Sequence, residues 1–71
     1  MKKEIIAGLQ VTKTEHTKGD AYGLTNATLP QIESLYFNLC NKYHRVENHF
    51  TSSLGGFMNW NGYFLCKEEI C

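Results

Sequence analysis

The chain has 71 residues, seven basic and seven acidic side chains, 42% hydrophobic residues and a charged fraction of 20%. This length fits a single globular domain over residues 1–71, and the hydrophobic content excludes simple disorder. Because the charges cancel, the chain as a whole offers no electrostatic attraction to a nucleic-acid backbone or to an anionic membrane. A domain of this size buries only about 60% of the surface that its unfolded chain exposes, so we expect marginal stability and some further support, such as a disulfide, a metal or a partner chain.

The N-terminus and the cysteines indicate a cytoplasmic protein. Residues 1–10 begin like a signal peptide, but Gln10 ends an apolar run that is too short, and no stretch approaches the roughly 18 apolar residues of a membrane span. Cys40, Cys66 and Cys71 are odd in number, which is not typical of a disulfide framework and agrees with a reducing compartment. We expect Cys71 to be a free thiol at the end of the chain.

Two strands are predicted in the first 25 residues. Residues 4–14 alternate with period two, which indicates one half-buried strand. The polar segment 15–20 ends in the turn signal Lys18-Gly19-Asp20, and a short second strand, residues 21–25, would pair back across it. The apolar face of the first strand would carry Ile5, Ala7, Leu9 and Val11.

The best-marked element is a helix from Leu29 to about His44. Thr28 suits the N-cap, Gln31 completes a capping box three residues later, and Pro30 lies in the first turn, where a missing N–H costs nothing. Apolar side chains then recur at helical spacing, which predicts the face that packs on the rest of the domain. These side chains are Ile32, Leu35, Tyr36, Leu39 and Tyr43.

The C-terminal third predicts two more strands. Residues 45–50 alternate, residues 51–56 suit a loop, and residues 57–67 form an aromatic segment. This segment is either one long strand or a tight hairpin that turns on Asn61-Gly62. The simplest arrangement is an α+β fold, in which a small antiparallel sheet of three or four strands carries one helix on one face, in the order strand, possible strand, helix, strand, strand.

The aromatic segment has no polar face in either arrangement. A one-sided antiparallel strand would alternate apolar and polar residues, whereas here large apolar groups fall on both sides. One helix covers only one face of a sheet. The second face would therefore be covered by the N-terminal strand, by a second subunit or by a partner protein, unless the core itself uses both faces.

One flank of the predicted helix raises the possibility of a metal site or an active thiol. Cys40 and His44 lie one helical turn apart, and His49 and Cys66 could complete a zinc site. A histidine beside a cysteine can also lower the pKa of the thiol. The spacings match no specific motif and no Cys-x-x-Cys is present, so we predict no metal and no cofactor and keep this class as an alternative. The flank consists of Glu33, Phe37, Cys40 and His44.

No motif indicates a reaction. The three histidines and nearby glutamates could supply a general acid and base, but no nucleophile elbow, phosphate-binding loop or paired-carboxylate signature accompanies them. We therefore predict that the chain is not an enzyme and has no catalytic residues. Binding of a single-stranded nucleic acid is a further alternative. Trp60 and Tyr63 could stack bases, but no basic residue interleaves with them before Lys67.

These observations predict a small protein-binding module that acts as an inhibitor or adaptor of another protein. Phages and mobile elements encode many such blockers of host defence, including anti-CRISPR proteins. The assignment to this group rests on the small size of the chain, its neutral charge and its lack of motifs. A homodimer that buries the second face of the sheet is compatible with it. The predicted partner-binding residues are Phe57, Met58, Trp60 and Tyr63 in the aromatic segment, Phe37 and Tyr43 on the helix, and Arg45 and Glu47 in a polar rim.

Overall fold

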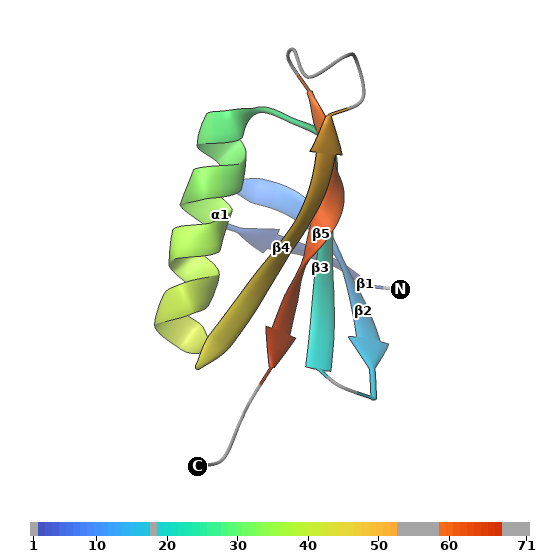
Figure 1. The fold of residues 1–71 in the computed structure, drawn as a ribbon, viewed down its shortest axis with the longest axis vertical. Coiled ribbons are helices and arrows are strands. Elements are labelled where there is room, and N and C mark those ends of the chain that lie inside the picture. Colours follow the sequence, from blue (N-terminus) through green and yellow to red (C-terminus); the bar gives the residue numbers. More distant parts are fainter. Residues whose placement is uncertain (1, 18, 53–58, 68–71) are drawn as a thin grey trace.

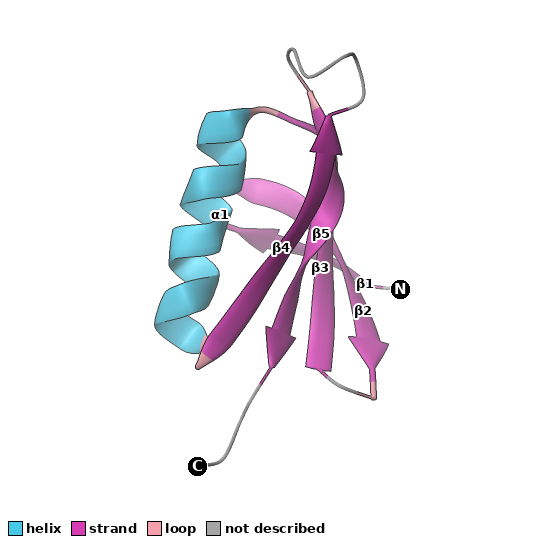
Figure 2. Ribbon diagram, in the orientation of Figure 1, coloured by secondary structure: helices cyan, strands magenta, loops and turns pink. Residues whose placement is uncertain are grey.

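A computed structural model describes residues 2–17, 19–52 and 59–67. Within them, five strands form one antiparallel sheet, and a single helix packs on one of its faces (Figures 1 and 2). The predicted fold class is confirmed, but the sheet has five strands, where three or four were predicted. The elements are β1 (Lys2–Ile6), β2 (Leu9–His16), β3 (Gly19–Ala27), α1 (Leu29–Lys42), β4 (Arg45–Ser52) and β5 (Trp60–Lys67).

The strands lie in the order β1-β2-β3-β5-β4. The chain leaves β3, runs through α1 to the far edge of the sheet as β4, and returns as β5 between the two. β5 is antiparallel to both neighbours, so β3 and β4 are parallel to each other with one strand between them. This split β-α-β arrangement places α1 across one face and leaves the other face to be formed by side chains of all five strands.

The extra strand arises because residues 4–14 do not form one strand. Ala7 and Gly8 have positive φ angles of 54° and 77°, as a two-residue hairpin turn requires, and they separate β1 from β2. The turn shifts the alternation by one position, so Ile6 and Leu9 are paired and both pack against the core. Ile5 is 77% exposed on the opposite face. The predicted grouping of Ile5 with Leu9 is therefore wrong.

The strand predicted at residues 21–25 is confirmed as β3, which is longer than predicted. β3 continues to Ala27 through an irregularity after Leu24, where Asn26 has a φ of 54°. The side-chain Oδ1 of Asn61 on β5 accepts a hydrogen bond of 2.8 Å from the Asn26 backbone N–H and so holds this bulge. Ala27 is buried beyond the bulge, one residue before the helix cap.

The helix begins at Leu29 as predicted and ends at Lys42, two residues before the predicted end. The Thr28 backbone N–H donates a hydrogen bond of 2.9 Å to Gln31 Oε1, which confirms this half of the capping box. The buried residues of α1 are Ile32, Leu35 and Leu39. With 14 residues, α1 falls short of the length and apolarity that a membrane crossing needs, and no other helix occurs in the described part of the chain.

The aromatic segment is one straight strand from Trp60 onward, so the hairpin at Asn61-Gly62 is wrong. Neither residue has the positive φ of a type I′ turn, and both are paired on β4 across a continuous ladder. Trp60, Phe64 and Cys66 face α1, whereas Asn61, Tyr63 and Leu65 lie on the other face; these sets follow from the alternation along β5.

The core lies between α1 and the sheet. Phe64 at its centre is fully buried and packs edge-on against Phe50, with 4.8 Å between ring centroids. The hydroxyl groups of Tyr22 and Tyr43 hydrogen bond at 2.8 Å, which satisfies the polar end of a buried tyrosine. The largest fully buried side chains are Tyr22, Phe64, Leu35, Leu39, Val11 and Cys66.

A pair of glycines in adjacent strands tests the packing of β5. A Cβ atom at Gly62 would clash with the His49 carbonyl oxygen and lie 2.7 Å from the Phe50 Cα, both of them backbone atoms of β4. Gly62→Ala should therefore destabilise the domain by about 1–3 kcal/mol or prevent folding. At Gly23 the nearest atoms would lie at 3.7 and 3.8 Å, so Gly23→Ala should change the free energy of unfolding by less than about 0.5 kcal/mol or stabilise slightly. Urea denaturation of both variants measures the difference, and equal midpoints would contradict the register of β4 on β5.

The tyrosine pair predicts a loss of stability at alkaline pH. Burial and the hydrogen bond to Tyr22 raise the pKa of Tyr43 from its ordinary value of 10.0 to about 12, and burial also raises the pKa of Tyr22. The folded protein therefore retains protons that the unfolded chain releases. This contribution is complete below pH 10 and is lost as the pH rises towards 12. Urea midpoints measured from pH 8 to 12 should fall in this window, and Tyr43→Phe should fall less steeply. Equal slopes for the two proteins would refute this assignment.

Candidate functional site

The face of the sheet opposite α1 is the candidate functional site, and we call it the open face. No described element lies over it, because α1 packs on the other side and β1 pairs at the sheet edge beyond β2 (Figure 1). Of the three ways in which this face could be covered, the one that uses the N-terminal strand is therefore excluded for the described residues. The strand pairings place one row of side chains straight across its centre. The row is Lys3, Thr12, Gly23, Tyr63 and His49, one residue from each strand.

A hollow of about 520 Å³ lies in the middle of the open face. It exists because Gly23 adds no side chain to the central row. In the next row, which contains Thr14, Ala21 and Leu65, Ala21 adds only a methyl group. Every residue that lines the hollow is uncharged. Three strands line it: β2 with Thr12 and Thr14, β3 with Ala21, Gly23, Leu24 and Thr25, and β5 with Asn61, Gly62 and Tyr63.

Aromatic and aliphatic groups border the hollow. Tyr63 is 41% exposed, and its ring stacks on the imidazole of His49 with 4.8 Å between centroids and an interplanar angle of 20°. Leu65 occupies the next position along β5 on the same face and is half-buried. The stack fixes the Tyr63 ring at the rim, which reduces the side-chain entropy that would be lost on binding.

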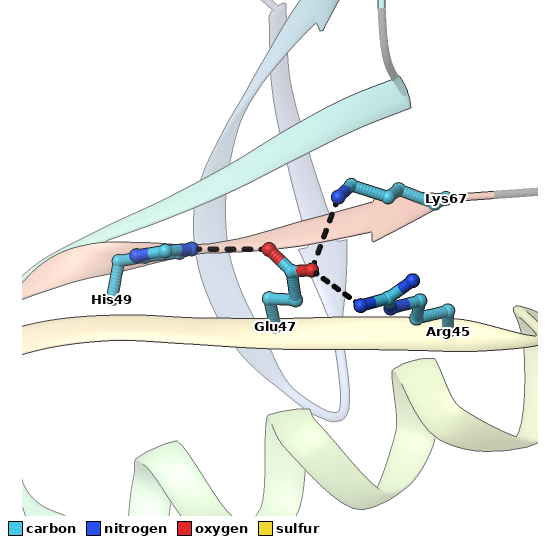
Figure 3. Close-up of polar contacts among 4 residues, drawn as sticks. All are labelled: Arg45, Glu47, His49 and Lys67. Carbon is cyan, nitrogen blue, oxygen red and sulfur yellow. Dashed lines mark hydrogen bonds and ion pairs between the residues drawn. The ribbon is translucent and has the colours of Figure 1, made fainter.

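A charged cluster adjoins this border (Figure 3). The Glu47 carboxylate accepts a 3.0 Å hydrogen bond from Lys67 Nζ and lies 3.4 Å from an Arg45 guanidinium nitrogen, while its second oxygen lies 3.5 Å from His49 Nε2. The hydrogen bond from Lys67 is the main cause of the lowered pKa of Glu47. A carboxylate held in the ionised form by several donors is a weak base, so the cluster suits electrostatic positioning better than proton transfer.

The four residues of the metal or thiol alternative do not come together. Cys66 is buried beneath α1, whereas His49 lies on the open face, so the two lie on opposite sides of the sheet. Burial raises the pKa of the Cys66 thiol to about 11, which disfavours the reactive thiolate. Cys40 is exposed on α1. Among the described residues, no group of three or more histidine, cysteine, aspartate or glutamate side chains could hold a metal ion, and Cys71 lies outside them.

The predicted partner-binding residues fall on three separate surfaces. Tyr63, Arg45 and Glu47 lie together on the open face. Trp60 and Tyr43 are partly buried and pack against the core on the helix side. Phe37 is 72% exposed on α1, on the far side of the domain from the open face, and Phe57 and Met58 lie outside the described residues.

Sequence reasoning missed the hollow altogether. Its key residues are the small ones, Ala21 and Gly23, which occupy successive open-face positions of β3 between β2 and β5. Small residues at alternate positions of a predicted strand are a signal that could have been found at Ala21 and Gly23. Their alignment with Thr12 and Tyr63 depends on the strand register.

The position of Trp60 predicts a stability effect in place of a binding effect. Because the indole packs against the core beneath α1, Trp60→Ala should lower the free energy of unfolding by about 2–4 kcal/mol. Phe37→Ala, at an exposed position on α1, should change it by less than about 0.5 kcal/mol. Chemical denaturation followed by circular dichroism measures both. If Trp60→Ala were as stable as the native chain, the indole would not belong to the core.

Comparisons of the chain with protein-family models, with curated protein sequences and with solved structures gave no match.

Proposed function

We propose that the chain is a protein-binding module that docks a partner on its open face and catalyses no reaction of its own. The observation that supports this most directly is the 520 Å³ hollow, rimmed by Tyr63, on a face that no described element covers. Apolar and aromatic groups exposed around a depression are typical of surfaces that bind another protein.

The composition of the open face supports a protein partner. Its centre combines uncharged lining with the Tyr63 ring and the half-buried Leu65, while the Glu47 cluster lies to one side. Protein interfaces have this pattern, in which an apolar centre with aromatic anchors is bordered by charged groups that remain partly hydrated. A side chain of the partner would fill the hollow and displace its water.

The protonation and burial of two potentially reactive side chains support the proposal that the chain catalyses no reaction. Glu47 is held ionised, and Cys66 is buried with a raised pKa. An inhibitor or adaptor of another protein, cytoplasmic and of the kind that phages direct against host defences, remains the class of role that we propose. Such a role requires binding alone.

Filling the hollow tests the proposal. Gly23→Val places a branched side chain into the hollow, at a position where a Cβ atom meets only ordinary contacts, so the domain should fold with an unchanged or higher melting temperature. A photo-cross-linking amino acid at position 63 should capture a partner protein in cells that express the chain, and Gly23→Val should abolish this capture.

The matched control carries the same cross-linker at position 37, which is exposed on α1. It should not capture the partner. Equal capture from positions 37 and 63, or capture that survives Gly23→Val in the folded protein, would overturn the proposal. Capture of a second copy of the chain alone would replace it with a homodimer that buries the open face.

A further inference from the structure

The charges of this neutral chain are divided unequally between the two sides of the sheet. Lys3, Arg45 and Lys67 belong to the open face, as their pairing positions show. Glu47 is the single carboxylate of the described residues that shares this face. The other described carboxylates are Glu4, Glu15 and Asp20, at positions that alternate with the open face, and Glu33, which is exposed on α1.

Among the described residues, the open face therefore has three lysine or arginine cations and one carboxylate, an excess of two positive charges. Glu47 contacts Lys67 and Arg45 directly, so its single negative charge offsets only one of these two cations. Partners of a charged surface usually present the opposite sign, which steers encounter and disfavours wrong partners.

The cations flank the uncharged hollow from both ends. Lys3 lies on β1 at one end of the central row, and the Arg45–Lys67 pair lies on β4 and β5, four residues along these strands from His49 and Tyr63. With neighbouring strands about 4.8 Å apart and a rise of about 3.3 Å per residue, Arg45 lies roughly 19 Å from Lys3 across the strands and roughly 13 Å along them, about 23 Å in all. An extended segment covers this distance in about seven residues.

We infer that the partner docks with an acidic segment that inserts one bulky apolar side chain into the hollow and presents carboxylates on both sides of it, towards Lys3 and towards Arg45 and Lys67. This inference rests on the proposed function and names the chemistry of the partner. The apolar side chain matches the uncharged lining, and the carboxylates match the flanking cations.

A protein segment fits these features better than a nucleic acid does. Affinity for a phosphate backbone comes largely from neutralising many phosphates, and two excess charges around a carboxylate supply little of it. Discrete carboxylates separated by an apolar side chain place charge only where the open face has cations.

Peptide selection tests the inference and needs no identified partner. Random 12-residue peptides displayed on phage are selected against the immobilised full chain, and the enriched peptides are synthesised with a fluorophore for anisotropy measurements. We expect enrichment of Asp or Glu on both sides of a Trp, Phe or Leu, and a Kd that rises at least fivefold between 50 and 300 mM NaCl, because screening weakens exposed charge pairs.

Two neighbouring lysines provide a matched pair of variants. Lys2 and Lys3 are both exposed on β1, but Lys3 pairs with Thr12 on the open face and Lys2 pairs with Lys13 on the other side. Lys3→Glu should raise the Kd of a selected peptide about fivefold to tenfold, whereas Lys2→Glu, with the same net charge, should change it less than twofold. Gly23→Val should raise it more than tenfold in a protein with an unchanged melting temperature.

The outcomes separate the two proposals. If Gly23→Val abolishes partner capture at position 63 but Lys3→Glu and Lys2→Glu behave alike, or selection yields neutral peptides or none, the acidic segment is wrong and the proposed function stands. If Gly23→Val leaves partner capture intact, both are wrong. A 20-nucleotide oligo-dT that binds more tightly than every selected peptide, and with the same dependence on Lys3, would assign the open face to a nucleic acid.

Discussion

The pairing of β5 on both of its edges is the constraint on which the rest of the structure depends. β5 lies between β3 and β4 and pairs with both, and Gly62 lets the β4 backbone approach more closely than any side chain would allow. This position keeps residues 60–67 in one continuous strand. It also brings Phe64 beneath α1 at the centre of the core.

A central strand with apolar groups on both sides has consequences for both faces. α1 buries the side that carries Phe64 and Cys66, and this burial is where the domain gains most of its hydrophobic stabilisation. The side that carries Tyr63 and Leu65 has no equivalent cover among the described elements. The same alternation that builds the core therefore also builds the open face, and a small domain is left with one face available for a partner.

The shape of the open face depends on a missing side chain as well as on the side chains that are present. Gly23 leaves a gap in the central row, and the gap becomes a hollow only because Thr12 and Tyr63 flank it in register. The charges follow the same rule. A chain with no net charge has a cationic open face because strand alternation places most of its described carboxylates elsewhere, so the proposed preference for an acidic partner depends on register and not on composition.

The sequence by itself determined the features that depend on a few neighbouring residues. The helix with its Thr28–Gln31 cap and the two-sided character of the aromatic segment follow from local hydrogen bonding and from periods of 3.6 and 2 residues. Only the tertiary structure decided the turn at Ala7-Gly8, the packing of Trp60 against the core and the alignment of Lys3, Gly23 and Tyr63. These depend on which strands pair and in which register, and pairing is set by contacts between residues far apart in the chain. A shift of one residue in one strand would move every side chain of that strand to the opposite face, and the hollow would vanish with it.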